Sequence, residues 1–282
     1  MNATLADKAP VPAGKFVTTA DGHRIHYHEQ GQGPALLMLH GSGPGASGWS
    51  NFKGNADKLA AAGYRVLVPD ALGYGYSDKP VAEDYTLALF NRGLYGFIDA
   101  LELESYALVG NSLGGTMALK AAIERPQQVT AVVALGPGGL ANFDVYRNMP
   151  GIKAMLTAPA EPGGASRESL RAVFELQLFD PGLITDALIA ERQFILRQQP
   201  AHVFRTLNIS SIAERLHEVG CPVMVFWGMN DKFCPVETHR IILQTCQDSR
   251  VVLLNRCGHW VQLEYQRFFN AACAAFLAEH CS

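Results

Sequence analysis

Short apolar runs recur along the chain and alternate with segments in which apolar residues return every three or four positions. A short continuous apolar run is typical of a strand buried on both faces of a parallel sheet. Such runs lie at Ala35–Leu39, Tyr64–Pro69, Tyr106–Gly110, Val129–Leu135, Pro222–Trp227 and Arg250–Leu254. Helical patterns separate them at Ser50–Ala62, Leu87–Leu103, Leu113–Glu124, Val236–Gln247 and Gln266–His280. Strands that alternate with helices predict a mostly parallel, doubly wound α/β sheet.

Two parts of the chain depart from this alternation. Near the start, two short segments flank a turn and predict a β-hairpin: Lys15–Thr19 and Arg24–His28. Later, residues 140–218 contain several prolines and glycines and two amphipathic helical stretches, Glu168–Leu178 and Leu183–Gln198. We interpret this interval as a helical lid inserted into an α/β core that consists of residues 1–139 and 219–282.

The composition is that of a globular protein with a large core. Of the 282 residues, 48% are hydrophobic and 17% are charged. The formal net charge of -3 argues against nucleic acid or an anionic membrane as the main partner. No apolar run is long enough to span a membrane, and Met1–Lys15 lacks the apolar core of a secretory signal. We therefore expect a cytoplasmic protein.

The cysteines do not have the spacing of a metal site or of a redox motif. The six positions are Cys221, Cys234, Cys246, Cys257, Cys273 and Cys281. We expect them to be reduced thiols, and we expect neither a metal nor a cofactor.

A pentapeptide around Ser112 is the clearest chemical motif. Residues 110–114 read GNSLG, which has the form G-x-S-x-G, and they lie directly between an apolar strand and a helical segment. This is the context that the motif requires, because the turn projects the serine hydroxyl above the carboxyl edge of the sheet. Small flanking residues leave room for such a strained turn. We therefore predict an α/β-hydrolase fold with Ser112 as the nucleophile.

A serine hydroxyl needs a base, and in this fold an acid and then a histidine follow the serine along the chain. Asp231 comes after the strand Pro222–Trp227, and His259 comes after the strand Arg250–Leu254. Two neighbouring strands would thus deliver both side chains to the edge that carries Ser112. We predict His259 as the general base and Asp231 as the residue that orients it. Asp231 could instead be an N-cap for the helix that follows it.

The turn His40-Gly41-Ser42-Gly43 follows the strand Ala35–Leu39. An H-G-x-G turn at this place commonly donates a backbone N–H toward the nucleophile. The Leu113 N–H lies at the start of the helix after Ser112, where the partial positive charge of the helix stabilises an oxyanion. Ser42 and Leu113 are therefore the predicted oxyanion-hole donors.

Several longer strings resemble the meta-cleavage product hydrolases, which break carbon–carbon bonds in bacterial aromatic degradation. The strings are HGSGPGASGWSNF at 40–52, GNSLG at 110–114, GPGGL at 136–140, FDPGLITDALIAER at 179–192 and CGHW at 257–260. They span nearly the whole chain, and the first and fourth are the specific ones, because ordinary esterases share only the triad.

The resemblance implies a small anionic substrate of the 2-hydroxy-6-oxohexa-2,4-dienoate type. Its hydrolysis would give 2-hydroxypenta-2,4-dienoate and a carboxylic acid. An anion needs a cation, and Arg192 matches the family's lid arginine, which can hold a carboxylate bidentately. Asn51 and Asn111 match residues that hydrogen-bond the dienoate end, and Trp260 matches an aromatic that packs on the substrate. The expected substrate-binding residues are Gly41, Asn51, Asn111, Gln177, Arg192 and Trp260.

Gln177 departs from the family pattern, which has a phenylalanine there, near the scissile ketone. Leu113 also departs from it, since methionine is commoner after the nucleophile, but only its N–H is needed. We expect Gln177 on the acyl side of the site, so that the group carried by C6 would differ from a plain phenyl.

Two points stay open in the sequence. Ser112 could attack the ketone and form an acyl-enzyme, or water could attack directly and form a gem-diol. The same triad would also serve a carboxylesterase or a lactonase, and a catalytically idle binding module is a third possibility. Relatives commonly form dimers or larger assemblies, so we expect a homo-oligomer.

Overall fold

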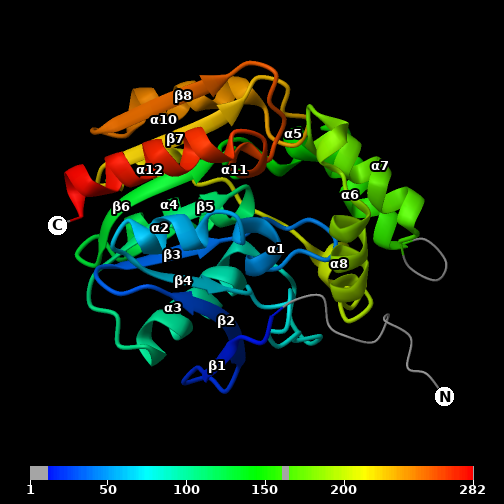
Figure 1. The fold of residues 1–282 in the computed structure, drawn as a ribbon, viewed down its shortest axis with the longest axis horizontal. Helices are drawn as coiled ribbons and strands as arrows, with labels where there is room; N and C mark the ends of the chain where they lie inside the picture. Colours follow the sequence, from blue (N-terminus) through cyan, green and yellow to red (C-terminus); the bar gives the residue numbers. More distant parts are fainter. Residues whose placement is uncertain (1–11, 161–164, 282) are drawn as a thin grey trace.

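The computed structural model describes residues 12–160 and 165–281. An eight-stranded sheet forms its centre, in the order β1-β2-β4-β3-β5-β6-β7-β8 (Figure 1). The strands are β1 Lys15–Thr18, β2 Arg24–Gln30, β3 Ala35–Leu39, β4 Arg65–Pro69, β5 Tyr106–Asn111, β6 Val129–Leu135, β7 Val223–Gly228 and β8 Ser249–Leu254. Strands β3 to β8 pair in parallel, whereas β2 is antiparallel to β1 and β4. The predicted hairpin and the predicted parallel sheet are confirmed.

Both faces of the sheet are apolar and both are covered by helices. In β3, Leu36 and Met38 belong to one core cluster, while Leu37 and Leu39 belong to the other. This alternation follows from the two-residue period of a strand. The helices of the core are α1 Gly48–Phe52, α2 Ala56–Ala61, α3 Leu87–Ala100, α4 Leu113–Glu124, α10 His239–Thr245, α11 Val261–Glu264 and α12 Gln266–His280. No helix in the described ranges is long and apolar enough to cross a membrane.

The single helix predicted over Ser50–Ala62 is wrong, because the structure has two short helices there, α1 and α2. The break lies at Gly54 and Asn55. A Cβ on Gly54 would lie 2.0 Å from Nε2 of Gln266, so a side chain there would displace the end of the Gln266 side chain. The Asn55 amide donates to the Gln262 carbonyl (3.1 Å) and to Asn270 Oδ1 (2.8 Å), which ties the break to the C-terminal helices. These contacts are tertiary, and the local hydrophobic pattern does not contain them.

A group of short helices lies between β6 and β7. They are α5 Phe143–Arg147, α6 Pro150–Thr157, η2 Ala158–Ala160, α7 Arg167–Gln177, η3 Pro181–Leu183, α8 Asp186–Leu196, α9 His202–Thr206 and η4 Ala213–Glu218. Figure 1 shows α5 to α8 gathered at one end of the sheet, next to the loop that leads into α1. Residues 140–218 remain our proposed lid.

Candidate active site

Ser112 occupies a strained turn between β5 and α4. Its φ of 56° and ψ of -118° lie in a region that side chains rarely adopt. The two motif glycines explain how the chain reaches this turn. A Cβ on Gly110 would lie 2.2 Å from the Gly114 carbonyl oxygen, and a Cβ on Gly114 would lie 2.0 Å from the Leu39 carbonyl oxygen. The close packing of this turn therefore requires glycine at both positions, and the turn places Ser112 at the carboxyl end of β5.

Asp231 and His259 are in direct contact at the same edge. His259 Nδ1 lies 2.7 Å from Asp231 Oδ2, and both side chains are almost completely buried. Asp231 Oδ2 also accepts a hydrogen bond from Trp227 Nε1 (3.1 Å). Its Oδ1 accepts the N–H groups of Phe233 (2.7 Å) and Cys234 (3.0 Å). Four donors thus fix the carboxylate, which in turn orients the imidazole.

The alternative interpretation of Asp231 as a helix N-cap is wrong. The N-caps of the next two helical segments are Pro235 and Thr238. The Asp231 carboxylate instead closes its own turn, which brings the Phe233 ring onto His259 with the centroids 5.0 Å apart and the planes 17° apart. The stacked ring restricts the rotation of the imidazole.

The main chain holds the His259 loop from two sides. The His259 N–H donates to the Gln177 carbonyl (2.7 Å), and the Asn111 amide donates to the His259 carbonyl (3.3 Å). Ser112 and His259 line one cavity. The Ser112 hydroxyl also interacts with the Cys234 thiol, and no hydrogen bond joins Ser112 to His259 within the described ranges. A rotation of the short serine side chain is enough to change its partner, as is common in ligand-free sites.

The turn that carries Ser42 lies directly against the nucleophile. A Cβ on Gly41 would lie 3.2 Å from the Ser112 Cβ. His40 fixes this turn, since its Nε2 accepts from the Ala71 N–H (3.0 Å) and its Nδ1 therefore donates to the Gly41 carbonyl (2.7 Å). On the other side, Leu113 is the first residue of α4, so its N–H has no intrahelical acceptor. The two predicted oxyanion-hole donors thus belong to the two segments that flank Ser112.

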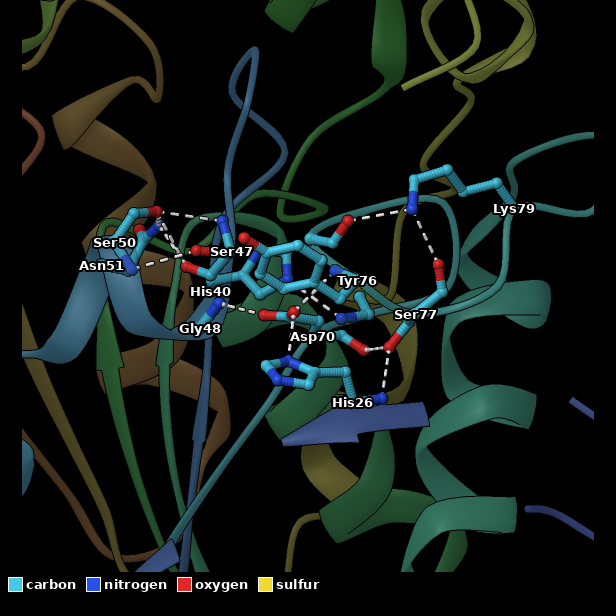
Figure 2. A network of polar contacts seen from close by, with 12 residues as sticks. His26, His40, Ser47, Gly48, Ser50, Asn51, Asp70, Tyr76, Ser77 and Lys79 are labelled. Atoms are coloured by element: carbon cyan, nitrogen blue, oxygen red, sulfur yellow. Dashed lines mark hydrogen bonds and ion pairs between the residues drawn. The ribbon is translucent and has the colours of Figure 1, made fainter. Parts of the chain in front are cut away.

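A buried polar network supports this turn and the start of α1 (Figure 2). Asp70 is at its centre and accepts hydrogen bonds from the Gly48 N–H (2.7 Å), the Tyr76 N–H (2.9 Å) and His26 Nδ1 (2.8 Å). Burial acts to raise the pKa of Asp70, but His26 and the other donors outweigh it and lower the pKa below its usual value. Through the Gly48 N–H the carboxylate anchors the helix that carries Asn51.

Asn51 is held by the same network. Its amide donates to the Ser47 carbonyl (3.1 Å), and Ser47 and Ser50 form a capping box at the start of α1. The sequence reading missed His26, His40 and Asp70. The signal available for Asp70 was its position directly after an apolar strand, which is the signal that identified Asp231.

Arg192, on α8, is the only predicted ligand that carries a positive charge, and it is fully buried. Its guanidinium carbon lies 4.8 Å from the ring centroid of Trp260 and 5.8 Å from that of Phe174. None of its three nitrogens has a hydrogen-bond partner in the described ranges, and the neighbouring Glu191 pairs with Lys53 instead. Burial lowers the pKa of Arg192 to about 10, while Glu191 opposes the shift, so the side chain stays charged at neutral pH.

All the predicted substrate-binding residues line one cavity with Ser112 and His259. They are Gly41, Asn51, Asn111, Gln177, Arg192 and Trp260. Asn111 donates to two carbonyls, but its buried Oδ1 has no partner in the same described ranges. The cavity therefore holds an unpaired cation and an unpaired acceptor, and it is polar; we call it the arginine pocket.

A second cavity lies on the other side of Ser112 and is apolar. It shares Ser42, Ser112 and Met155 with the arginine pocket. Its further lining includes Phe143, Tyr146, Ile152, Leu207, Ile209 and Cys234. We call it the apolar pocket. Gln177 lines the arginine pocket and not the apolar pocket, so its place on the acyl side of the site stays a prediction.

Glu264 is a further residue that the sequence reading missed. Its Oε1 accepts the Gly258 N–H (2.6 Å), and its Oε2 accepts the N–H groups of Phe179 (2.7 Å) and Asp180 (3.2 Å). The carboxylate thus links the His259 loop to the chain after α7. Burial raises the pKa of Glu264, and the three N–H donors oppose this shift.

The six cysteines are free thiols, and four of them are buried. No group of three or more His, Cys, Asp or Glu side chains in residues 12–160 and 165–281 is arranged to hold a metal ion.

Comparison with known proteins agrees with this geometry. Residues 34–265 match the family model described as the alpha/beta hydrolase fold. A 2-hydroxy-6-oxo-6-phenylhexa-2,4-dienoate hydrolase from Burkholderia cepacia is 37% identical over 278 residues, which cover 94% of this chain and 96% of that one. The chain belongs to the meta-cleavage product hydrolases of the α/β-hydrolase fold.

Two other members of the family are also similar to this chain. A 2-hydroxy-6-oxononadienedioate/2-hydroxy-6-oxononatrienedioate hydrolase from Comamonas testosteroni is also 37% identical, with the same coverage of 94% and 96%. The solved structure of a meta-cleavage product hydrolase from Pseudomonas fluorescens superposes with a TM-score of 0.81 at 27% identity, and it covers 95% of this chain and 98% of that one.

Proposed function

We propose that this meta-cleavage product hydrolase cleaves the carbon–carbon bond of a 2-hydroxy-6-oxohexa-2,4-dienoate, giving 2-hydroxypenta-2,4-dienoate and a carboxylic acid. The observation that carries the proposal is the buried, unpaired guanidinium of Arg192 in the cavity that Ser112 and His259 line. A buried charge without a partner is destabilising by several kcal/mol. An anionic substrate would supply the missing partner, and a neutral ester would not.

The substrate would lie across Ser112. Its carboxylate would bind Arg192 and its 2-hydroxyl would donate to Asn111 Oδ1, with the chain extending toward the nucleophile past Trp260. The ketone at C6 would then lie beside Ser112, between the N–H groups of Ser42 and Leu113. These donors would stabilise the oxyanion that forms when the ketone is attacked, and the loss of one such donor costs about 3 kcal/mol in other hydrolases.

The reaction would start with a shift of a proton from the 2-hydroxyl to C5, which turns the dienol into a ketone. Ser112 then attacks C6 while His259 takes the hydroxyl proton and Asp231 stabilises the imidazolium. When the oxyanion collapses, the C5–C6 bond breaks and its electron pair moves into the conjugated 2-keto system, which takes up a proton. Water activated by His259 hydrolyses the acyl group from Ser112 and releases the acid.

The gem-diol route differs only in the group that attacks C6. An acyl adduct on Ser112, trapped by acid quenching in a single turnover and located by mass spectrometry, would support the covalent route. Burst kinetics without any adduct would favour direct attack by water.

A carboxylesterase or lactonase is the alternative function. An esterase from Exiguobacterium antarcticum superposes with a TM-score of 0.80 at 22% identity, which is a likeness of fold alone. Two assays on the purified enzyme separate the functions. The proposal predicts catalytic bleaching of the yellow ring-fission dienolate and weak hydrolysis of p-nitrophenyl acetate. Brisk ester hydrolysis without bleaching would overturn it.

The proposal includes a cytoplasmic location and a homodimer or larger assembly. Six free cysteines suit a reducing compartment. Light scattering on the eluted peak of a size-exclusion column measures the assembly.

A further inference from the structure

The apolar pocket contains no charged side chain among the residues that the structure describes. The lid helices α5 and α6 contribute to it, and each carries a basic residue. These residues, Arg147 and Lys153, are exposed and do not line the pocket, although the Arg147 guanidinium carbon lies 6.0 Å from the ring centroid of Phe143. The side chains with which α5 and α6 line the pocket are Phe143, Tyr146, Ile152, Met155 and Leu156.

Few donors in the apolar pocket are free. The Tyr146 hydroxyl accepts the Leu140 N–H (2.9 Å), which leaves its own proton as a donor, and the Thr116 hydroxyl donates to the Ser112 carbonyl (3.2 Å). Burial raises the pKa of the Cys234 thiol, so the thiol is neutral. The charge that acts on both Cys234 and Tyr146 is the Asp231 carboxylate, which is negative.

Sequence identity does not decide whether the C6 substituent of the substrate is charged or uncharged. The two relatives with 37% identity have different names, one for a substrate with a phenyl group and one for a dienedioate with a second carboxylate. The two substrate classes differ in the charge on the C6 substituent. A pocket that recognises a carboxylate needs a cation or several free donors.

We propose that the apolar pocket binds the C6 substituent and selects an uncharged alkyl or aryl group over one that ends in a carboxylate. The inference rests on the proposed function, because it assigns the dienoate end to the arginine pocket. A carboxylate in the apolar pocket would lose its hydration, would gain no cation from the described lining and would lie within reach of the negative charge that acts on Cys234 and Tyr146. A penalty of this kind corresponds to a kcat/KM that is roughly 100-fold lower.

The test compares two dienoates that differ only at the end of the C6 substituent. One carries a 2-carboxyethyl group, and the other carries a propyl group, in which a methyl stands for the carboxylate. The decay of dienolate absorbance gives kcat/KM for each. We expect the propyl substrate to be preferred by about 100-fold, the phenyl substrate to be used as well, and the preference to change little between low and high salt.

A variant pair tests whether the pocket itself makes the selection. Ile209 lines the pocket and is half-buried, so a lysine there can keep its amine at the edge while facing the substituent. Ile209→Lys should raise the relative use of the carboxyethyl substrate about tenfold, and Ile209→Met, of similar length, should keep the wild-type preference.

The outcomes separate the two proposals. Efficient bleaching of all the dienoates, with the carboxyethyl compound used as well as the propyl one, would overturn the inference and leave the carbon–carbon hydrolase in place. An unchanged preference in Ile209→Lys, in a variant that folds and bleaches the propyl compound, would also overturn it. No bleaching of any dienoate would refute the proposed function, and the inference with it.

Discussion

The two pockets that meet at Ser112 are built from opposite chemistry. The arginine pocket contains a buried cation and an unpaired amide oxygen, both of which lack partners within the described ranges. The apolar pocket has no charge among its described lining residues, and few of its donors are free. Among the described residues, the arginine pocket therefore lacks an anion for its guanidinium and a donor for its amide oxygen, whereas the apolar pocket has no charge that needs a counter-ion.

The difference also extends to what supports each pocket. The arginine pocket rests on the loops after β3 and β4, where Asp70 anchors the start of α1, and on the loop that carries His259. Much of the apolar pocket comes from α5 and α6 between β6 and β7. The inserted helices also serve the arginine pocket, since α8 carries Arg192 and α7 ends at Gln177. We infer that the inserted helices contribute both to the binding of the shared end of the substrates and to the selection of the variable end.

The largest expected effect concerns Ser112, which both pockets share. Ser112→Ala should lower kcat by about 10⁴-fold or more for every dienoate, because the nucleophile is lost while both pockets remain. Substrate binding, measured from the shift of the dienolate spectrum, should persist. Ser42→Ala should cost only a few-fold, since its proposed contribution is a main-chain N–H. Near-normal turnover by Ser112→Ala would contradict covalent attack by Ser112.

Removal of the Arg192 cation should weaken the binding of dienoates in the arginine pocket and leave the apolar pocket unchanged. Arg192→Met should lower kcat/KM for dienoates by about 10²- to 10³-fold and change neutral-ester hydrolysis by less than about threefold. The melting temperature should stay equal or rise, because a buried unpaired charge is gone. Arg197→Met, an exposed position at the end of the same helix, is the control. Equal losses on both substrates together with a lower melting temperature would mean that Arg192 is structural.

A variant of Asp70 tests whether the buried polar network next to the arginine pocket stabilises the fold. Its folded pKa is lowered, so the carboxylate stabilises the fold at pH values above its usual pKa of 3.8, and this contribution is lost as the pH falls below that value. Asp70→Asn should therefore reduce the free energy of unfolding by roughly 3 kcal/mol at pH 7, and by less near pH 3.

Urea unfolding at the two pH values measures this difference. Asp57→Asn, an exposed position on α2, is the matched control and should change stability little at either pH. An Asp70→Asn deficit of the same size at both pH values would show that its ionisation does not stabilise the fold.

Among the residues that support the site, the smaller effect is expected at Glu264, which links the His259 loop to the lid. In Glu264→Gln an amide NH₂ replaces one of the two accepting oxygens, so kcat should fall roughly tenfold for all dienoates. Protonation of the wild-type carboxyl has a similar effect, and burial raises its pKa. As the pH is lowered, the wild-type kcat should therefore begin to fall at pH values above the usual pKa of a glutamate.

The variant should lack the part of this acid limb that comes from Glu264, while any part that comes from the general base His259 remains. Glu279→Gln, at an exposed carboxylate paired with Arg250, should keep both kcat and the limb. A Glu264→Gln enzyme with the full wild-type pH profile would mean that Glu264 does not position His259.

Much of the site was predictable because its residues follow strands. Ser112, Asp231 and His259 each come directly after an apolar run, and parallel strands bring their carboxyl ends to one edge. The supports were not predictable, because their contacts are long-range. His26 and Asp70 are 44 positions apart, and Glu264 binds a backbone N–H 85 positions away.

The failed prediction of one helix over Ser50–Ala62 has the same cause. The helix break depends on contacts of Asn55 with the C-terminal helices. The pocket that Gln177 lines is decided by the packing of α7 against the His259 loop. Neither the hydrophobic pattern nor the resemblance to a family contains this information.

A crystal structure of the Ser112→Ala enzyme with a bound ring-fission dienoate is the most direct test. It shows whether the arginine pocket binds the dienoate end and the apolar pocket binds the C6 substituent. The substrate carboxylate should lie about 3 Å from the Arg192 guanidinium. C6 should lie next to residue 112, with its substituent among Tyr146, Ile152 and Leu207. A carboxylate bound in the apolar pocket, or an Arg192 still without a partner in the complex, would contradict the account.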